Sequence, residues 1–350
     1  MDDQYQRCDL KLSGEYREHR VNWSDHSVLV TGCTGLVGSW LTQALIERGA
    51  HVVGLVRDGV THNHFTRAGL AQHMTLVSGD LSEISRLERT LNEYEIETVF
   101  HLAAQAIVPI AYRNPLSTFE TNIRGTYLLL EACRRHSVVK RIVIASSDKA
   151  YGDQATLPYT EDAPLKGAYP YDVAKTCVDL LAQSYWKTYQ LPVCITRCAN
   201  IFGGGDLQWT RLIPKTIRNA LCDHAPTIRS DGTFQRDYLY VKNIVDGYLL
   251  LAERMDELHC YGEAFNFGME RPYTVLEMVE TILSQMGKTH LMPQILDTAK
   301  GEIRNQYLST HKARSVLGWT PRYSLKDGLA ETIAWYTEYF EEARCVQQLV

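Results

Sequence analysis

The segment TGCTGLVG, residues 31–38, constrains the fold more than any other stretch of the sequence. It places Gly32, Gly35 and Gly38 between the apolar run SVLVTG and the amphipathic run VGSWLTQALIERG. The first run is typical of a buried strand, and the second is typical of a helix that ends at Gly49. Glycines at such a junction permit a tight turn and let backbone N–H groups approach a pyrophosphate at the helix N-terminus. A tight βα turn without a ligand is the alternative, and the GxxGxxG spacing alone does not separate the two.

The alternation of short β-branched runs and helical stretches continues to about residue 203. Strands are predicted at residues 27–32, 51–56, 74–80, 98–104, 141–147 and 193–203. Helices are predicted at residues 37–49, 85–94, 118–136 and 171–189. Strands separated by helices in this way form βαβ units. We therefore expect an α/β fold with a Rossmann-type, doubly wound parallel sheet and a smaller C-terminal substrate-binding lobe.

Beyond residue 203 the pattern loosens into short elements separated by loops rich in Gly, Asp and Pro. DYLYVKNIVDGYLLLAERM is an exception, because it is typical of a strand and a helix that return to the first part of the chain. We predict an N-terminal extension over 1–25 and an NAD(P)-binding Rossmann domain over 26–202 plus about 237–258. The predicted substrate-binding lobe covers about 203–236 and 259–350.

Charge and cysteine content argue against several classes of protein. The net charge is −5, so no sequence-wide basic field indicates nucleic acid or an anionic membrane as a partner. The nine cysteines are scattered and form no CxxC pair, which favours reduced thiols in a cytoplasmic protein. No apolar run approaches the ~20 residues of a membrane span, and the polar N-terminus contains no signal segment. His62 and His64 have no third ligand close in sequence, so we predict a loop there and no metal site.

The end of the second predicted strand bears on the choice between NAD and NADP. A carboxylate at this point accepts a hydrogen bond from the ribose of NAD, but the position holds Val56. Arg57 follows, and an arginine there suits the 2′-phosphate of NADP. Asp58 could neutralise Arg57 or reach the ribose itself, so the sequence favours NADP and leaves NAD open. Asp80, at the end of the third strand, is either an adenine contact or a helix N-cap.

AYPYDVAK places Tyr171 and Lys175 four residues apart on one face of a predicted helix. A cation near a phenol stabilises the phenolate and lowers the pKa of tyrosine from about 10. Such a tyrosine can take a proton from a sugar hydroxyl while a hydride leaves the same carbon. An ordinary surface pair is the alternative, but the glycine loop upstream favours catalysis. Ser147 would complete a triad by hydrogen-bonding the substrate oxygen.

Six motifs occur in the order found in the extended short-chain dehydrogenase/reductase family: TGCTGLVG, HLAAQA, TNIRGTYLLLEA, SSDKAYG, YDVAK and RCANIFGGGD. Over residues 26 to 340 the sequence resembles nucleotide-sugar dehydratases and epimerases, and HLAAQ, SDK, GGGD and RLIP are most similar to CDP-glucose 4,6-dehydratases. The resemblance implies a Rossmann fold, a retained nicotinamide cofactor and a nucleoside-diphosphate sugar in the cleft between the lobes. It also implies a homodimer through a four-helix interface, formed by the helices that begin near Thr118 and Tyr171.

The resemblance also assigns residues to ligands. Around the cofactor, in addition to the residues above, it implies Leu36, Val37, Leu81, Leu102, Ala103, Ala104 and Asn122. Around the substrate it implies Gln105 and Asn200. Three arginines are candidates for the diphosphate: Arg236 in SDGTFQRDYLYV, Arg304 in GEIRNQYLST and Arg211 in TRLIP. A solvated surface position is the alternative for each arginine.

Asp148 and Lys149 separate the two reactions that the resemblance allows. Both reactions begin with loss of the O4 proton and the C4 hydride, but a 4,6-dehydratase also needs a base at C5 and an acid at the C6 hydroxyl. The resemblance implies Asp148 as that acid and Lys149 as that base. A lysine base needs a lowered pKa, which burial and the Lys175 cation would favour and Asp148 would oppose.

We therefore predict an NDP-hexose 4,6-dehydratase. The first alternative is an NDP-sugar 4-epimerase of the same fold, in which Asp148 and Lys149 form a structural ion pair at the end of the strand. The second alternative is a non-catalytic dinucleotide-binding protein. The presence of Ser147, Tyr171 and Lys175 together argues against it, since a protein that only binds a dinucleotide has no need of all three.

Overall fold

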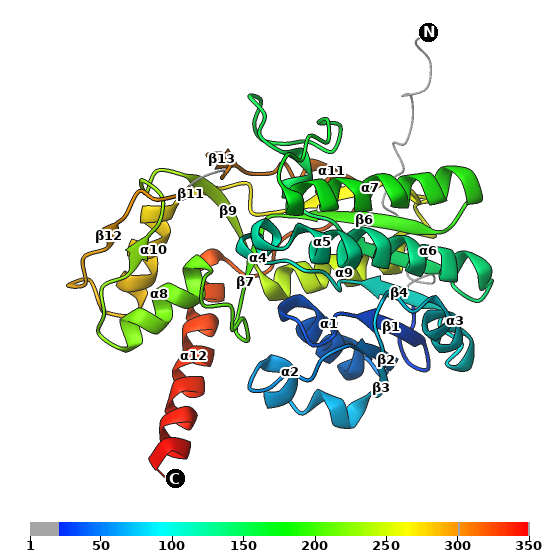
Figure 1. The fold of residues 1–350 in the computed structure, drawn as a ribbon, viewed down its shortest axis with the longest axis horizontal. Coiled ribbons are helices and arrows are strands. Elements are labelled where there is room, and N and C mark those ends of the chain that lie inside the picture. Colours follow the sequence, from blue (N-terminus) through cyan, green and yellow to red (C-terminus); the bar gives the residue numbers. More distant parts are fainter. Residues whose placement is uncertain (1–20, 300–301, 349–350) are drawn as a thin grey trace, which may run out of the picture.

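The computed structural model describes residues 21–299 and 302–348. Its centre is a seven-stranded parallel sheet in the order β10-β6-β5-β4-β1-β2-β3 (Figure 1). The strands are β1 (Ser27–Thr31), β2 (His51–Val56), β3 (Thr75–Ser78), β4 (Thr98–His101), β5 (Arg141–Ala145), β6 (Val193–Cys198) and β10 (Ala264–Phe267). The chain order reverses between β1 and β4, with β2 and β3 on one side of β1 and the later strands on the other. This topology confirms the predicted Rossmann-type sheet.

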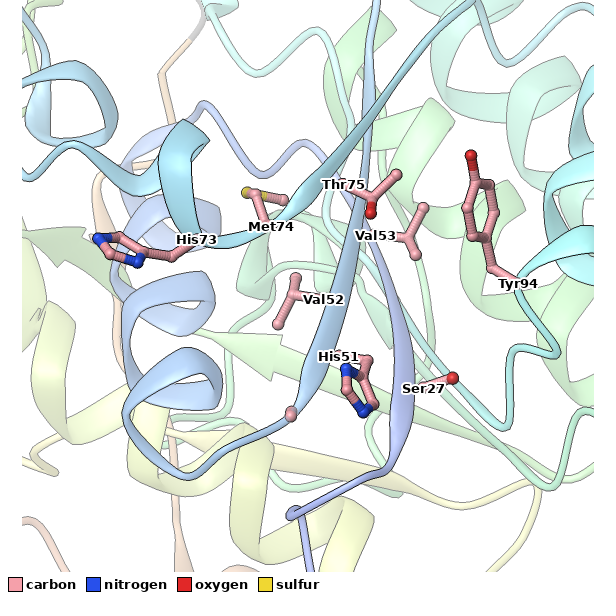
Figure 2. Close-up of a pocket in the computed structure, with 9 residues that line it drawn as sticks. Ser27, His51, Val52, Val53, His73, Met74, Thr75 and Tyr94 are labelled. Carbon is pink, nitrogen blue, oxygen red and sulfur yellow. The ribbon is translucent and has the colours of Figure 1, made fainter.

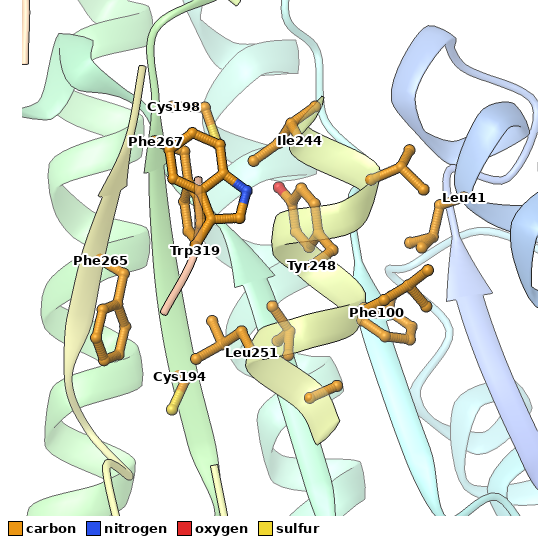
Figure 3. Close-up of a cluster of buried hydrophobic side chains, with 14 of the residues drawn as sticks. Leu41, Phe100, Cys194, Cys198, Ile244, Tyr248, Leu251, Phe265, Phe267 and Trp319 are labelled. Atoms are coloured by element: carbon orange, nitrogen blue, oxygen red, sulfur yellow. The ribbon is translucent and has the colours of Figure 1, made fainter. Parts of the chain in front are cut away.

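Helices cover both faces of this sheet. One face carries α1 (Leu36–Glu47), α9 (Val241–Arg254) and α11 (His311–Leu317), and the other carries α3 (Ile84–Glu93), α6 (Gly125–Arg135) and α7 (Pro170–Tyr189). Successive strand residues point to opposite faces, so Val28 and Val30 join the first core cluster and Leu29 joins the second. Figure 3 shows part of the first cluster, where Tyr248 of α9 and Trp319 meet the strands of the sheet.

Short helical segments lie in the connections of the large sheet. They are α2 (His64–Arg67), η1 (Leu70–His73), α4 (Val108–Arg113), α5 (Pro115–Phe119), a π-helical turn η2 (Glu120–Arg124) and a 3₁₀ turn η3 (Asp148–Tyr151). The helix predicted over 118–136 is thus made of the end of α5, the π-turn and α6. The charged strand end SSDKAYG becomes η3, which begins directly after Ser147.

A smaller lobe is built around a second sheet in which β9 (Gln235–Tyr240) pairs with β11 (Pro272–Thr274), β13 (Asn305–Gln306) and β7 (Asn200–Phe202). A third, two-stranded sheet joins β8 (Thr227–Ile228) to β12 (Gln294–Ile295). Around these strands lie α8 (Leu212–Leu221), α10 (Val275–Gln285) and the C-terminal α12 (Leu325–Gln348). This arrangement agrees with the expected smaller lobe, whose boundaries remain a prediction.

Three strand assignments differ from the sequence prediction. The strand predicted over 193–203 divides at Ala199 into β6 of the large sheet and β7 of the small one. The strand β9 joins the small sheet, although the helix α9 that follows it does return to the large one. The strand β10 lies within the range predicted for the substrate lobe, yet it pairs with β6 of the large sheet. Its four residues, AFNF, are all buried, and so short a run has no periodicity to reveal its sheet.

Residues 1–20 of the predicted extension lie outside the described part of the chain. Within the extension, Trp23 is buried in the core and its Nε1 donates a hydrogen bond to Glu253 at 2.8 Å, so core packing begins before residue 26. His64 is not in a loop but begins α2, and its ring stacks on Trp40. In the described ranges no group of three His, Cys, Asp or Glu residues is placed to hold a metal ion. None of the helices in those ranges is long and apolar enough to span a membrane.

Candidate active site

The predicted site residues gather at the carboxyl edge of the large sheet. Gly32 follows β1, Arg57 follows β2, Asp80 lies beyond β3, Leu102 follows β4, Ser147 lies beyond β5 and Asn200 lies beyond β6. Open α/β sheets bind ligands at this edge, where the strand order reverses. Here the reversal lies between β1 and β4, so the glycine loop and the HLAAQ loop lie on either side of it.

The glycine loop has the geometry of an anion site. Gly32 has φ +74°, and a Cβ there would lie 2.7 Å from the backbone nitrogen of Ala103; a Cβ on Gly38 would lie 2.0 Å from the carbonyl oxygen of Gly32. Helix α1 begins at Leu36 with no side-chain cap on Gly35 and no acidic residue in its first turn. Its N–H groups and the positive end of its dipole are therefore available to a pyrophosphate. The residues present fit a dinucleotide, with Leu36 and Val37 in the first turn of the helix.

Asn122 and Gln105 hold the loop that follows β4. The side chain of Asn122 accepts from the backbone N–H of Gln105 at 2.7 Å and donates to its carbonyl oxygen at 3.1 Å. The amide of Gln105 is bonded to the backbone of Ile107 and to Thr118. Both side chains thus shape the loop that carries Leu102, Ala103 and Ala104, and their predicted contacts with cofactor and substrate stay predictions.

Arg57 lies between two carboxylates. Its Nε donates to Asp58 at 2.7 Å, and its Nη1 lies 3.8 Å from Asp80. Asp80 is not the N-cap of α3, which is Glu83; instead its Oδ1 accepts from the backbone N–H of Ser82 at 2.8 Å. The adjacent Leu81 is buried in the core beneath α6. The region predicted to bind the ribose therefore carries one cation and two anions.

The structure brings Ser147, Tyr171 and Lys175 together, as predicted. Ser147 lies close enough to Tyr171 to oppose the rise that burial causes in the pKa of the phenol. The Nζ of Lys175 donates to the carbonyl oxygen of Ala145 at 2.6 Å, and burial lowers the pKa of this lysine to about 8. Burial raises the pKa of Tyr171, and the cation that opposes this effect is Arg211. The ammonium of Lys175 is turned to the strand end, and the predicted lowering of the Tyr171 pKa by Lys175 stays a prediction.

Asp148 and Lys149 have shifted pKa values of opposite direction. Burial raises the pKa of the Asp148 carboxyl, although Lys149 and its hydrogen bond from Ser147 oppose the shift. Burial, followed by the charge of Arg236, lowers the pKa of Lys149, and Asp148 opposes this. The predicted directions for Lys149 hold, but the nearby cation is Arg236 rather than Lys175. A carboxyl that keeps its proton and an ammonium that loses it are suited to act as acid and base.

Hydrogen bonds fix the positions of the Asp148 and Lys149 side chains. The Oδ1 of Asp148 accepts from Ser147 Oγ at 3.0 Å, whereas Oδ2 is buried and has no hydrogen-bond partner among the described residues. The Nζ of Lys149 donates to Oε1 of Gln306. The Nε2 of Gln306 is likewise buried without a partner in the described part of the chain. Unpaired buried polar atoms are costly, and here they line a site where a ligand can satisfy them.

Gln306 and Asp172 are two polar groups of the site that the sequence analysis missed. Gln306 pairs with Arg236 across the β13–β9 ladder, which brings it to Lys149 from the far end of the chain. Asp172 is buried in the first turn of α7, and burial raises its pKa to about 6, with Lys149 opposing the shift. In the sequence, Asp172 could have been noticed as the acidic residue of YDVAK directly after Tyr171.

The three candidate arginines differ in burial. Arg236 is buried, and its Nη1 donates to the carbonyl oxygens of Gln235 and Arg304 at 2.8 and 2.9 Å. Arg304 is exposed, and its guanidinium, like that of Arg236, lies over the ring of Phe234. A shared aromatic platform therefore brings two cations together at the edge of the small sheet.

Arg211 and Asn200 are each held by a neighbouring residue. Arg211 is the N-cap residue of α8 and is held by Asp206 at 2.9 Å, and its charge acts on Tyr171. Asn200 begins β7, and its Nδ2 donates to the carbonyl oxygen of Asp237 at 3.3 Å. The substrate contacts of these residues and of the two other arginines stay predictions.

A surface pocket lies at the other edge of the large sheet (Figure 2). It is lined by residues at the amino ends of three strands, among them Ser27 of β1, His51 of β2 and Thr75 of β3. This is the edge opposite to the glycine loop and to Ser147, so the pocket is separate from the candidate active site.

The chain is similar to nucleotide-sugar dehydratases and epimerases in sequence and in fold. The GDP-mannose 4,6 dehydratase family model matches residues 29–332. The CDP-glucose 4,6-dehydratase of Salmonella typhimurium is 32% identical over 330 residues, which cover 90% of this chain and 91% of that protein. A dTDP-glucose 4,6-dehydratase from Streptomyces venezuelae, solved with NAD bound, matches with a TM-score of 0.80 and 28% identity over 89% of this chain and 97% of its own. A UDP-glucose 4-epimerase from Thermotoga maritima, solved with UDP-glucose, matches with a TM-score of 0.82 and 28% identity over 90% of this chain and 99% of its own.

Proposed function

The chain belongs to the GDP-mannose 4,6 dehydratase family, within the extended short-chain dehydrogenases/reductases, and on this premise we propose that it is an NDP-hexose 4,6-dehydratase. The resemblance expected from the motifs is thereby confirmed. The observation that carries the proposal is the pair Asp148 and Lys149. They lie beside Tyr171, and burial shifts their pKa values toward a protonated acid and a neutral base.

Each residue of the site has its own proposed role in the reaction. The glycine loop and the first turn of α1 would hold a nicotinamide cofactor, which would supply a hydride acceptor for C4 of the hexose and a hydride donor for C6. Tyr171 and Ser147 take the proton from O4, and Lys149 takes the proton from C5, which the neighbouring 4-ketone acidifies. Asp148 protonates the departing C6 hydroxyl, and Arg236, Arg304 and Arg211 bind the diphosphate.

The retained cofactor is proposed to be NAD. NAD is bound in the related dehydratase structures. In this chain, Asp58 and Asp80 flank Arg57, the residue that alone suggested NADP. One cation between two carboxylates has a net negative charge, which disfavours a 2′-phosphate. Denaturing the purified protein and identifying the released nucleotide tests this proposal.

A homodimer is the proposed assembly. The helices named for the interface are α5–α6 and α7, and they expose large apolar side chains: Leu116, Tyr127, Leu180 and Tyr189. Exposed apolar residues gathered on neighbouring helices favour burial against a second copy.

The dehydratase proposal is tested by offering UDP-, CDP-, GDP- and dTDP-hexoses to the enzyme in deuterated water. A 4-keto-6-deoxy product with solvent deuterium at C5 is expected. An inverted C4 without deuterium would instead identify a 4-epimerase. The latter is the second candidate, because Ser147, Tyr171 and Lys175 suffice for it and because the Thermotoga maritima epimerase has the same fold.

Replacement of Lys149 tests the assignment of the base. In Lys149→Met, C4 oxidation should persist while dehydration falls by roughly 10²-fold or more, since a positioned base contributes about that factor. Reduced nicotinamide, seen near 340 nm, should then accumulate. Lys166→Met, at an exposed lysine in the loop after η3, is the matched control. Dehydration at the wild-type rate by Lys149→Met would remove this residue from the mechanism.

A further inference from the structure

Glu302 is the carboxylate that faces the buried guanidinium of Arg236. The Nη1 of Arg236 donates to two backbone carbonyl oxygens, at 2.8 and 2.9 Å, and its Nη2 lies 3.8 Å from Oε2 of Glu302. The side chain of Arg236 is 10% exposed, so its charge needs a counterion. A separation of 3.8 Å is longer than a hydrogen bond, so Glu302 neutralises this charge without being fastened to it.

Glu302 has a second arginine within reach. Its Oε1 accepts a hydrogen bond from Nη2 of Arg229 at 3.1 Å. The side chains of Arg229 and Glu302 are 51% and 32% exposed, so this pair lies toward solvent, whereas Arg236 lies inside. A small rotation of the Glu302 side chain away from Arg236 would keep the bond to Arg229. The carboxylate can therefore leave the buried arginine and retain a cationic partner.

The neighbouring cation, Arg304, is held in a different way. Its Nη2 donates to Oδ2 of Asp231 at 3.3 Å and to the hydroxyl oxygen of Thr233 at 3.0 Å. The Oδ1 of Asp231 accepts from the backbone N–H and from the hydroxyl of Thr233, both at 2.8 Å. Asp231 is thus fixed by its own turn. Of the two acids beside these arginines, Glu302 is the one that can move.

Glu302 lies on the side of Arg236 that faces the candidate active site. Burial lowers the pKa of Lys149 in η3 and raises that of Tyr112 in α4, and the charge of Glu302 acts on both groups. Arg236 also acts on Lys149. Because the interaction of two charges weakens with distance, Glu302 lies among β9, η3 and α4, near the proposed base.

We propose that Glu302 takes the place of the substrate diphosphate in the free enzyme, and that a nucleoside diphosphate displaces it from Arg236 toward Arg229. The inference rests on the proposed NDP-hexose function, which supplies the diphosphate. A diphosphate carries about two negative charges and accepts two parallel hydrogen bonds from one guanidinium, so it can replace a carboxylate that forms none with Arg236. Glu302 thus stabilises the enzyme without ligand and weakens the binding of substrate and product.

Titration calorimetry of the holoenzyme with UDP, CDP, GDP and dTDP tests the proposal. For the nucleotide that binds most tightly, Glu302→Gln should lower the dissociation constant by roughly fivefold, the scale of a partly exposed ion pair that no longer has to be broken. If Glu302 instead holds Arg236 in the conformation that binds phosphate, the variant should bind the nucleotide more weakly. Weaker or unchanged binding would therefore overturn the proposal.

A control variant and a second ligand identify the cause of the gain. Glu257→Gln removes the same charge from a glutamate that is 28% exposed and pairs with Arg254 at 3.3 Å after α9, and it should leave the dissociation constant unchanged. An equal gain in both variants would indicate an effect of net charge and contradict the proposal. Inorganic pyrophosphate, which has no base or sugar, should show the gain in Glu302→Gln as well. A gain confined to the nucleotide would mean that Glu302 faces the base or the ribose, which also contradicts the proposal.

Arg229→Met tests where the displaced carboxylate goes. Without this arginine Glu302 loses its second partner, so the variant should bind the nucleotide more weakly than the wild type. In the Glu302→Gln background the same substitution should have a much smaller effect, because no carboxylate has to be displaced. Equal effects of Arg229→Met in the two backgrounds would mean that Arg229 contacts the phosphates itself, and displacement toward it would be refuted.

The inference and the dehydratase function fail in different ways. If the wild type dehydrates a hexose and Glu302→Gln binds the nucleotide no more tightly, only the role of Glu302 fails. If Glu302→Gln binds more tightly but the wild type forms no 4-keto-6-deoxy product from any hexose of the panel, the dehydratase function fails and the displacement of Glu302 stands. The cofactor content of each variant, measured after denaturation, confirms that the holoenzyme is intact.

Discussion

The ammonium group of Lys149 donates a hydrogen bond to the side-chain oxygen of Gln306, which lies 157 residues later in the chain. The contact joins η3, the turn that follows β5 of the large sheet, to β13 in the small one, where Gln306 pairs with Arg236. The amide oxygen holds the lysine without placing a negative charge beside it. The proposed base is therefore oriented by a neutral group while burial and Arg236 lower its pKa.

Gln306→Glu should raise the pKa of Lys149, because a carboxylate favours the charged ammonium. A lysine base acts only when unprotonated, so the ascending limb of kcat against pH should move to higher pH and the rate at neutral pH should fall. Gln306→Met, which removes the hydrogen bond and adds no charge, should not move the limb upward. An upward shift of the same size in both variants would show that the limb does not report Lys149.

Asp172→Asn should stabilise the protein at neutral and higher pH. Burial raises the pKa of Asp172 to about 6, so the folded protein holds this proton more tightly than the unfolded chain does. Stability is lost as the pH rises from about 4, where the unfolded carboxyl ionises, to about 6, where the folded one does. The variant should gain on the order of 2–3 kcal/mol above pH 6, and less as the pH falls toward 4.

Thermal and urea unfolding across pH 4.5 to 8 measure this gain. Asp153→Asn, at an exposed position in the loop after η3, is the matched control and should have little effect at any pH. A gain in Asp172→Asn that is equal at every pH would indicate that the substitution acts through packing rather than through the charge.

Local sequence patterns predicted the large sheet and its ligand-binding edge. The strands near Val28 and Ile142 are apolar runs next to amphipathic helices. The glycines of the first loop are required locally, because a Cβ on Gly32 or Gly38 would clash with nearby backbone atoms. What the sequence could not predict depends on distant pairing. Gln306 reaches Lys149 only because β13 adds to β9, and β10 joins β6 although nothing in AFNF indicates its sheet.

The effect of Lys175 on Tyr171 is a prediction that depends on where a long side chain points. The spacing of Tyr171 and Lys175 predicted that the ammonium would lower the pKa of the phenol. In the structure the ammonium turns to the carbonyl oxygen of Ala145, and burial of the phenol dominates. Spacing along a helix determines which residues share a face, but the hydrogen-bond partner of a long flexible side chain depends on the strand packed against it.

Asp58→Asn should shift cofactor preference toward NADP. The substitution removes the carboxylate that accepts a hydrogen bond from Arg57 at 2.7 Å, which frees the guanidinium for a 2′-phosphate. The ratio of the dissociation constants for NAD and NADP, measured on protein stripped of cofactor and reloaded, should change by roughly tenfold, which corresponds to about 1.4 kcal/mol. Asp223→Asn, whose partner Lys288 lies in the small lobe, is the control. An unchanged ratio would show that Arg57 does not approach the ribose.

Leu180→Glu should dissociate the proposed homodimer. Leu180 lies on α7 and is 53% exposed, so a carboxylate there does little to the fold of one chain. In an interface the same charge would lose its water, which costs several kcal/mol. Sedimentation velocity at micromolar protein should show a dimer for the wild type and a monomer for the variant. Leu296→Glu, at a leucine of similar exposure in the small lobe, should leave the assembly unchanged, and a wild-type monomer would refute the proposed assembly.

Asp179→Asn should destabilise the protein and also reduce the fraction of Lys175 that is charged at neutral pH. Asp179 is fully buried on α7, four residues after Lys175, and it holds Arg197 of β6 through two hydrogen bonds of 2.8 Å. Without its partner the buried guanidinium remains uncompensated, at a cost of about 3–5 kcal/mol in the free energy of unfolding.

Urea unfolding of Asp179→Asn, Arg197→Met and the double variant measures that cost, and the double variant should be less unstable than the sum of the two single ones. Asp179 also raises the pKa of Lys175, which burial has lowered to about 8. Its loss should lower that pKa further, so the fraction of charged Lys175 at neutral pH should fall. NMR titration of the Lys175 ammonium measures this directly. An unchanged titration in a destabilised protein would show that Asp179 serves only to fasten α7 to the sheet.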